Sequence, residues 1–224
     1  MHILFLSNYF PPEVNAPATR TYEHARQWVD DGHTVDVLTS VPNFPEGEVY
    51  EGYDNRLTEE VRDGIRTTRV PMYVSPNEGV VRRTLSYLSF MVSASWYAAR
   101  LPTPDVVVAT SPQFFAALAG FWVAQTKDVP FVLEIRDLWP ESVVAVGAMD
   151  RNVIIRFFEW IEERLYEAAD RIVVVTEAFE KAIADKGIAR DKISVVKNGI
   201  ETDGWDEPLD EERLEALRRT HDLD

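Results

Sequence analysis

The sequence predicts an α/β fold in which a doubly wound, mainly parallel sheet carries helices on both faces. Two observations lead to this prediction. Short apolar runs rich in Val and Ile are continuous rather than alternating, as expected of strands that are covered on both faces. Helix-like stretches separate most of these runs, which gives the repeated β-α-β order of an open parallel sheet.

Six segments are expected to form the buried strands. They are Ile3–Leu6, Val35–Leu38, Val106–Ala109, Phe131–Ile135, Ile172–Val175 and Ile193–Val196. In sheets of this kind, ligands bind beyond the carboxyl ends of the strands. The loops that follow these segments are therefore the places where a functional site is expected.

Five stretches with apolar residues at helical spacing are expected to pack on the sheet: Ala18–Asp31, Val80–Arg100, Phe114–Thr126, Val153–Ala169 and Glu177–Lys186. One segment departs from the β-α-β order. Two extended runs, Leu57–Arg62 and Ile65–Val70, flank an Asp63-Gly64 pair, a strong signal of a two-residue turn. We expect a β-hairpin at an edge of the sheet.

Composition excludes several functional classes. Of the 224 residues, 46% are hydrophobic and 27% charged, which fits one large globular domain and excludes disorder of the whole chain. The absence of cysteine excludes thiol catalysis, disulfides, zinc fingers and iron–sulfur clusters. The net charge of −15 argues against nucleic-acid binding. No leader with signal-peptide character precedes the first strand, so we expect a cytoplasmic protein.

A domain boundary is expected near residue 200. The segment from Glu201 to the end holds ten carboxylates and three arginines, so it accounts for −7 of the net charge of −15. We expect residues 1–200 to form one Rossmann-like domain. Residues 201–224 are expected to be an acidic interdomain linker and the start of a further domain.

The loop after the first strand lacks the glycines of a dinucleotide-binding turn, and the sequence has no P-loop. Instead it contains Pro11-Pro12 and runs through Asn15 and Ala16 into a helix that carries Arg20 in its first turns. The free N–H groups at such a helix start bind anions. The alternative is a proline-stiffened connection with Arg20 in a surface ion pair.

Polar side chains also follow later strands. Arg136, Asp137, Trp139 and Glu141 come directly after one buried strand, at the position of a ligand site in this architecture. The alternative is local: Asp137 caps the next turn and Arg136 pairs with Glu141. Ser111 follows another strand and suits acceptor or phosphate contact, although a helix N-cap explains it equally well.

Three segments together resemble the N-terminal domain of retaining GT-B glycosyltransferases of family GT4, in particular the bacterial branch that assembles O-antigen and capsule sugars. The first is Tyr9-Phe10-Pro11-Pro12-Glu13 with Ala16 and Arg20, in which Asn15 replaces the usual glycine; asparagine tolerates positive φ better than other non-glycine residues. The second is Arg136–Ser142. The third is Asn198-Gly199. Here Lys197 stands where the family commonly has proline, and Glu201 stands where it commonly has aspartate.

The resemblance implies a metal-independent, retaining hexosyl transfer from a nucleotide-sugar to a glycan or polyprenyl-linked acceptor, with no cofactor. Asp137 would accept or orient the acceptor proton. Acceptor or phosphate binding would involve Asn15, Ala16, Arg20, Arg136, Glu141 and Ser111, while Asn198, Gly199 and Glu201 would lie on the donor side between domains. The family's second domain holds most nucleotide-sugar contacts, so this chain alone is expected to be inactive.

Two other functions remain open: a sugar-nucleotide epimerase or hydrolase with the same fold, and a non-catalytic nucleotide or carbohydrate-binding module.

The stretch of residues 80–100 raises a separate question. Its sixteen uncharged residues, Thr84–Ala99, are too few to span a bilayer. With Arg82 and Arg83 at one end and two aromatic residues near the other, it suits either core packing or peripheral contact with a membrane.

Overall fold

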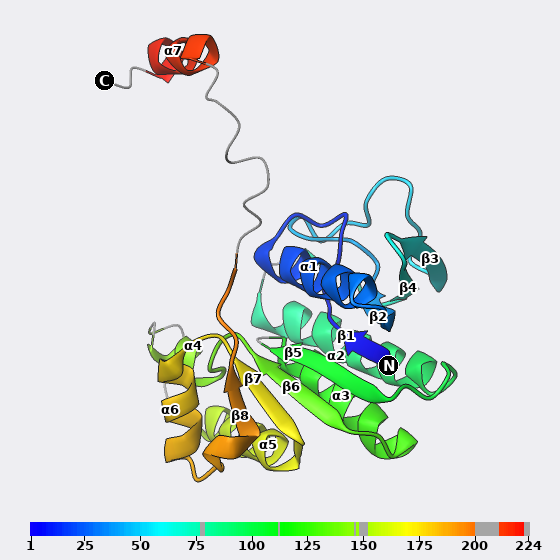
Figure 1. Cartoon of the computed structure of the whole chain (residues 1–224), viewed down its shortest axis with the longest axis vertical. Helices are drawn as coiled ribbons and strands as arrows, with labels where there is room; N and C mark the ends of the chain where they lie inside the picture. Colours follow the sequence, from blue (N-terminus) through cyan, green and yellow to red (C-terminus); the bar gives the residue numbers. More distant parts are fainter. Residues whose placement is uncertain (77–78, 112, 146, 148–151, 200–210, 222–224) are drawn as a thin grey trace.

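The computed structural model describes the chain except for residues 77–78, 112, 146, 148–151, 200–210 and 222–224. The strands are β1 (His2–Leu6), β2 (Thr34–Ser40), β3 (Thr58–Arg62), β4 (Ile65–Val70), β5 (Val106–Ser111), β6 (Phe131–Ile135), β7 (Arg171–Val174) and β8 (Ile193–Val195). They form one sheet in the order β3-β4-β2-β1-β5-β6-β7-β8, in which only the β3–β4 pair is antiparallel (Figure 1). The predicted mainly parallel sheet is confirmed.

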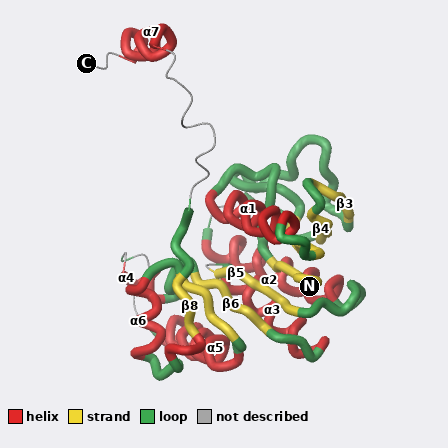
Figure 2. Tube along the Cα trace, viewed as in Figure 1, coloured by secondary structure: helices red, strands yellow, loops and turns green. Residues whose placement is uncertain are grey.

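The helices are α1 (Ala16–Asp30), α2 (Val80–Ala98), α3 (Phe114–Lys127), α4 (Glu141–Ala145), α5 (Val153–Ala168), α6 (Glu177–Asp185) and α7 (Glu211–His221), with a 3₁₀ turn at Arg190–Lys192. One face of the sheet is covered by α1, and a small core cluster lies beneath it. The larger core lies on the other face, under α2, α3, α5 and α6 (Figure 2). Helices thus cover both faces, as predicted.

The predicted hairpin is present, but only one of its arms lies at the sheet edge. Asp63 and Gly64 adopt φ of 50° and 79°, as a type I′ turn requires. The second arm, β4, pairs in parallel with β2 and so belongs to the main sheet. The chain then returns across the sheet through α2 to reach β5.

α3 lies unusually close to the sheet because it carries a glycine at the contact. A Cβ at Gly120 would lie 2.4 Å from the Cβ of Ala109 on β5. Five of the fourteen residues of α3 are buried Ala or Gly residues: Ala116, Ala117, Ala119, Gly120 and Ala124. This close approach places the start of α3 next to the end of β5.

Of residues 201–224, the expected linker and start of a further domain, the structure describes only α7 (Glu211–His221), and the rest lie outside the described residues. In the described part of the chain, no helix has the length and apolar character needed to cross a membrane.

Candidate functional site

The sheet has a topological switch point between β1 and β5. These strands are neighbours, but β1 leads into α1 on one face and β5 leads into α3 on the other. Open α/β sheets bind ligands in the crevice that this divergence creates at the carboxyl edge. Two hollows open at this edge, and we call them the cleft, of about 310 Å³, and the groove, of about 540 Å³.

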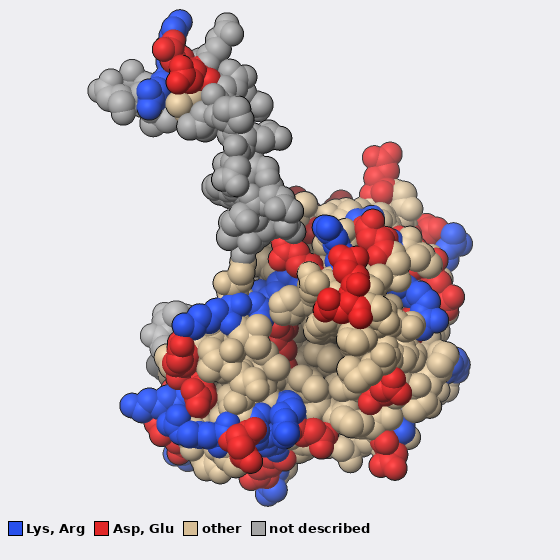
Figure 3. Space-filling view, viewed as in Figure 1, with Lys and Arg blue, Asp and Glu red and all other residues tan. Residues whose placement is uncertain are grey.

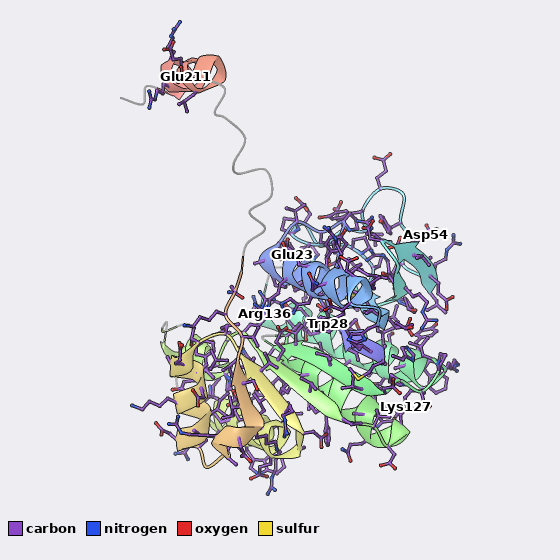
Figure 4. The ribbon with its side chains drawn as sticks, viewed as in Figure 1. Glu23, Trp28, Asp54, Lys127, Arg136 and Glu211 are labelled. Carbon is purple, nitrogen blue, oxygen red and sulfur yellow. The ribbon has the colours of Figure 1, made fainter. Side chains whose placement is uncertain are left out.

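The cleft combines three aromatic side chains, two arginines and several small polar groups. It is lined by Ser7, Asn8, Tyr9, Pro17, Arg83, Tyr87, Thr110, Ser111, Gln113, Arg136 and Trp139. The groove lies beside α1 and is more polar, with Ala16, Thr19, Arg20, Glu23, His24, Gln27, Arg136, Asn198 and Gly199 around it. Arg136 lines both hollows; it lies below the Glu23 side of α1 and next to the segment that follows β8 (Figure 4).

Asn15 caps α1. Its φ is −149°, in the extended region, so the expectation that asparagine would stand in for a positive-φ glycine is wrong. Extended backbone suits an N-cap, and the side-chain Oδ1 accepts a hydrogen bond from Ala18 N at 2.9 Å. This cap positions the first turn of α1, where Ala16 borders the groove.

Arg20 is buried rather than in a surface ion pair. Its Nε donates to Glu134 Oε1 at 2.8 Å, and its Nη1 donates to Asn198 Oδ1. Its third nitrogen, Nη2, is buried with no hydrogen-bond partner in the described structure. An unpartnered guanidinium nitrogen in a groove can bind an anion without giving up an existing contact.

The sequence analysis missed Glu134, the residue that anchors Arg20. Glu134 lies on β6 and is only 4% exposed, and it also faces His24 Nδ1 at 3.8 Å. Burial lowers the pKa of His24 below its usual value, against the opposing effect of Glu134. The signal available in the sequence was a single carboxylate within an otherwise apolar strand.

Arg136 has no ion pair among the described residues, so the expected alternative, pairing with Glu141, is not observed. Its Nε is buried without a hydrogen-bond partner. Burial lowers the pKa of its guanidinium, and the nearby charge of Arg20 adds to this effect while Glu134 opposes it. A partly buried cation of this kind gains from an incoming anion.

Asp137 and Glu141 are not among the residues that line the two hollows. The carboxylate of Asp137 accepts a hydrogen bond from the Ser142 hydroxyl at 2.8 Å, within its own loop. Glu141 is the first residue of α4, and its Oε2 lies 4.0 Å from Nζ of Lys186, at the end of α6. The structure therefore brings Arg136 to the hollows and leaves these two carboxylates beside them.

Ser111 lines the cleft as the last residue of β5, and it does not cap α3. The cap is Gln113, whose Oε1 accepts a hydrogen bond from Ala116 N at 2.9 Å. The Nε2 atom of Gln113 and the Oδ1 atom of Asn8 are buried without partners, and both residues line the cleft. Two unsatisfied amide groups in one cleft are suited to hydroxyl groups of a ligand.

The aromatic side chains of the cleft are held in place by contacts with other aromatic residues. The hydroxyls of Tyr9 and Tyr87 lie 3.4 Å apart. Burial, with a smaller effect of Tyr87, raises the pKa of Tyr9 far above its usual value, so its hydroxyl stays protonated. Trp139 packs on Phe114 and Phe158, with ring centroids 4.9 and 5.0 Å away. Preformed aromatic surfaces of this kind suit the apolar face of a sugar ring.

Asn198 and Gly199 lie on the segment after β8 and border the groove, whereas Glu201 lies outside the described residues. Figure 3 shows Lys and Arg side chains gathered at this end of the sheet face, near the root of the grey segment. In the described residues, no group of three or more potential metal-ligating side chains occurs.

A family model described as "Glycosyl transferase 4-like domain" matches residues 15–199. WcaI of Escherichia coli (strain K12), which carries the provisional name colanic acid biosynthesis glycosyl transferase, is 23% identical over 228 residues, covering 100% of this chain and 56% of WcaI. The solved structure of Anabaena HepE with UDP and glucose aligns with a TM-score of 0.59 at 13% identity, over 97% of this chain and 49% of HepE. A sucrose-phosphate synthase structure from Thermosynechococcus elongatus aligns with a TM-score of 0.57 at 12% identity, over 98% of each chain.

The chain thus spans about half the length of WcaI and of HepE. At these identities, the likeness to the solved structures shows the fold, which matches the predicted Rossmann-like half of a GT-B enzyme. The family model covers α1, the Arg136 loop and the Asn198-Gly199 segment, which are the three places where the groove residues lie. The chain belongs to the glycosyl transferase 4-like domain family.

Proposed function

We propose that this chain is the acceptor-side domain of a glycosyltransferase that moves a hexosyl group from a nucleotide-sugar donor to a glycan or polyprenyl-linked acceptor. The proposal includes retention of configuration at the anomeric carbon and no requirement for a metal. The family match and the names of the relatives support a transferase. HepE was solved with UDP and glucose, which supports a nucleotide-sugar as the donor.

The observation that carries the proposal is the position of Arg136 between the cleft and the groove. A group-transfer enzyme must hold two substrates with their reacting atoms in contact. Two adjacent hollows that share one cationic side chain meet this need. In this arrangement the acceptor occupies the cleft, and the diphosphate of the donor lies in the groove.

The groove offers positive groups to the leaving diphosphate. They are the N–H groups at the start of α1, the unpartnered Nη2 of Arg20 and the guanidinium of Arg136. Preorganised donors of this type stabilise the negative charge that develops on the leaving group. We propose that they act in place of a metal ion. Asn198 and Gly199 border the same groove and would face the donor-binding domain.

The cleft offers what an acceptor sugar needs. Tyr9, Tyr87 and Trp139 provide aromatic surface, and Asn8 and Gln113 provide unpartnered amide groups. Ser111 adds a hydroxyl at the end of β5.

For the acceptor proton we propose Asp137, which follows Arg136 directly in the loop after β6. A polyprenyl-linked acceptor would bring residues 80–100 of a cytoplasmic enzyme to a membrane surface.

Calorimetric titration of UDP and of UDP-glucose tests the assignment of domains. We expect the natural full-length protein to bind the nucleotide and this chain to bind it much more weakly, because the groove supplies only part of the donor contacts. Tight binding by this chain alone would contradict the proposal and identify a self-contained nucleotide-binding module.

The type of reaction is tested on the full-length protein. With a nucleotide-sugar and an acceptor sugar, we expect the product to keep the donor's anomeric configuration, as read from its NMR coupling constants. The activity should persist in EDTA. Release of free sugar or of an epimer, without transfer to the acceptor, would instead identify a hydrolase or an epimerase with the same fold.

A further inference from the structure

Glu13 is the most deeply buried carboxylate among the described residues, with 2% of its surface exposed. It lines neither the cleft nor the groove, and it makes no ion pair with the described residues. Its Oε1 accepts hydrogen bonds from the backbone N–H groups of Asn43 and Phe44, each at 3.0 Å. Its Oε2 accepts a third from the N–H of Phe10 at 3.4 Å. One side chain thus joins the loops that follow the neighbouring strands β1 and β2.

The local sequence explains why the carboxylate lies there. Pro11 and Pro12 have no N–H groups, and the chain turns at them, with the N–H of Glu13 donating to Phe10 O at 3.3 Å. The turn directs the side chain of Glu13 inward, towards the loop after β2. Buried backbone N–H groups need a hydrogen-bond partner. The carboxylate provides one for both loops.

Arg69 fixes the same turn from the side of β4. It is buried, and its guanidinium donates to the carbonyls of Pro11 and Ser40 while pairing with Glu60 at 2.7 Å. Burial raises the pKa of Glu13 above its usual value, although the three N–H groups and the charge of Arg69 oppose this effect. The turn between β1 and α1 is therefore held at both ends by buried polar contacts.

The loop after β2 forms a wall beside the cleft. All of residues 41–57 are described, and none belongs to a helix or a strand. Gly47 has a φ of 70°, and a Cβ there would collide with the backbone of Ser75 and Pro76, so the loop packs tightly on that segment. A small hollow of about 20 Å³ lies along it, lined from this loop by Asn43, Phe44, Pro45 and Gly47. The hollow shares four lining residues with the cleft: Asn8, Tyr9, Arg83 and Tyr87.

Tyr9 is held by Glu13 from two directions. Phe10, the next residue in the chain, gives its N–H to the carboxylate. Phe44, whose N–H bonds the other carboxylate oxygen, packs its ring edge-on against Tyr9 with the centroids 5.6 Å apart. The ring of Tyr9 lines the cleft, and its hydroxyl lies 3.4 Å from that of Tyr87. Loss of the carboxylate would therefore release the aromatic wall of the cleft.

We propose that Glu13 is a positioning residue of the cleft: through Phe10 and Phe44 it sets where Tyr9 lies, and thereby how an acceptor sugar is oriented for transfer. Because Glu13 lies outside the cleft, it acts only through these residues. Group transfer depends steeply on orientation, and a displacement of about 1 Å can lower the rate about 10²-fold. The role towards the acceptor rests on the proposed function, whereas the joining of the two loops does not.

Hydrogen exchange of single amides, followed by NMR on this chain, tests the joining without any substrate. In Glu13→Ala we expect the amides of Asn43 and Phe44 to exchange at least about 10-fold faster, while the amides of β5 keep their rates. Glu13→Gln should restore protection of these two amides, because both bond the same oxygen, but not that of Phe10. Unchanged exchange at Asn43 and Phe44 would overturn the proposal. An equal increase across the whole domain would also overturn it, because Glu13 would then serve only overall stability.

Steady-state kinetics of the full-length protein test the role towards the acceptor. Glu13→Ala should raise the KM for the acceptor at least about 10-fold and leave the KM for the nucleotide-sugar unchanged, and Glu13→Gln should recover most of this loss. Phe44→Ala keeps the N–H but removes the ring that contacts Tyr9, so it should raise the same KM. Because both changes act through Tyr9, the double variant should be little worse than the poorer single variant.

The matched control is Glu46→Gln, which removes an exposed carboxylate from the same loop and should behave as the wild type does. Equal changes in the KM of both substrates, or effects that multiply in the double variant, would overturn the proposal. If the wild type transfers sugar and Glu13→Ala has the same acceptor KM, this inference fails and the proposed function stands. A wild type that transfers no sugar would overturn the proposed function, and the exchange rates would still decide whether Glu13 joins the two loops.

Discussion

Arg20 on α1 and Glu134 on β6 form a buried ion pair, with Nε 2.8 Å from Oε1 although the residues are 114 positions apart in the chain. The side chains are 8% and 5% exposed. Through Nη1 the same guanidinium also contacts Asn198, after β8. One side chain thus ties α1 to the middle of the sheet and to the segment that borders the groove.

Removing one partner of this pair should destabilise the domain strongly. Glu134→Ala would leave the Arg20 charge buried and unpaired, for which a loss of about 3–5 kcal/mol is expected in the free energy of unfolding. Urea denaturation measures this loss as a lower midpoint. The control is Glu167→Ala, which removes an exposed partner of Arg164 and should cost no more than about 1 kcal/mol. Similar losses in both variants would show that the buried pair has no special weight.

Gly120→Ala should also destabilise, although alanine is the better helix former. The new Cβ would lie 2.4 Å from the Cβ of Ala109, which has no flexible side chain to move aside, so α3 must shift. We expect a loss of about 1–3 kcal/mol in thermal or urea unfolding. Adding Ala109→Gly should restore part of it. A variant as stable as the wild type would show that α3 has freedom to move away from β5.

The strands and most helices could be predicted because each depends on a local pattern: an apolar run for a strand, helical spacing for a helix. The position of the site could also be predicted, because ligands bind beyond the carboxyl ends of parallel strands. Ser111 is the last residue of β5, and Arg136 directly follows the neighbouring strand β6. Contacts between distant segments could not be predicted. Glu134 gains its role only from Arg20, far away in sequence, and Arg83 reaches the cleft only because α2 crosses the sheet.

The helix ends show a second limit of sequence patterns. Ser111 was a reasonable N-cap for α3, but β5 extends through it, so Gln113 caps the helix instead. Asn15 was expected to need positive φ by analogy with glycine, yet as an N-cap it is extended. In both cases a residue type fitted two local structures, and the tertiary fold selected one.

The stability of the domain should depend on pH through Glu162. This carboxyl is buried and is 2.7 Å from Lys186 Nζ, but burial outweighs the ion pair and raises its pKa above the ordinary 4.5. An acid with a raised pKa in the folded state contributes stability that is present below the unfolded pKa and is lost as pH rises through the folded pKa. The wild type should therefore lose more stability above about pH 4.5 than Glu162→Gln does.

Urea unfolding of the two proteins at a series of pH values checks this difference. Glu163→Gln removes one exposed carboxylate from the same helix and controls for the change in net charge. Parallel stability curves for the wild type and Glu162→Gln would contradict the prediction, because the Gln side chain does not titrate.

The two arginines of the cleft should affect different substrates. Arg83 lines the cleft but not the groove, whereas Arg136 lines both hollows. In the full-length protein, Arg83→Gln should raise the KM for the acceptor and leave the KM for the nucleotide-sugar unchanged. Arg136→Gln should raise both and lower kcat, by about 10²-fold if it stabilises charge on the leaving group. Steady-state kinetics with each substrate varied in turn measure these effects. A change confined to the donor in Arg83→Gln would reverse the assignment of the hollows.

Asp137 is the remaining test of the proposed chemistry. If its carboxylate accepts the acceptor proton, Asp137→Asn in the full-length protein should lower kcat by about 10²–10⁴-fold with little change in either KM. The carboxylate also holds the Ser142 hydroxyl at 2.8 Å, so a loss of activity alone would not separate catalysis from loop structure. Ser142→Ala removes that hydrogen bond and keeps the carboxylate. We expect it to retain most of the activity, because the proton acceptor is still present. If Ser142→Ala loses as much activity as Asp137→Asn, then Asp137 acts by holding the loop that carries Arg136, and another group takes the proton.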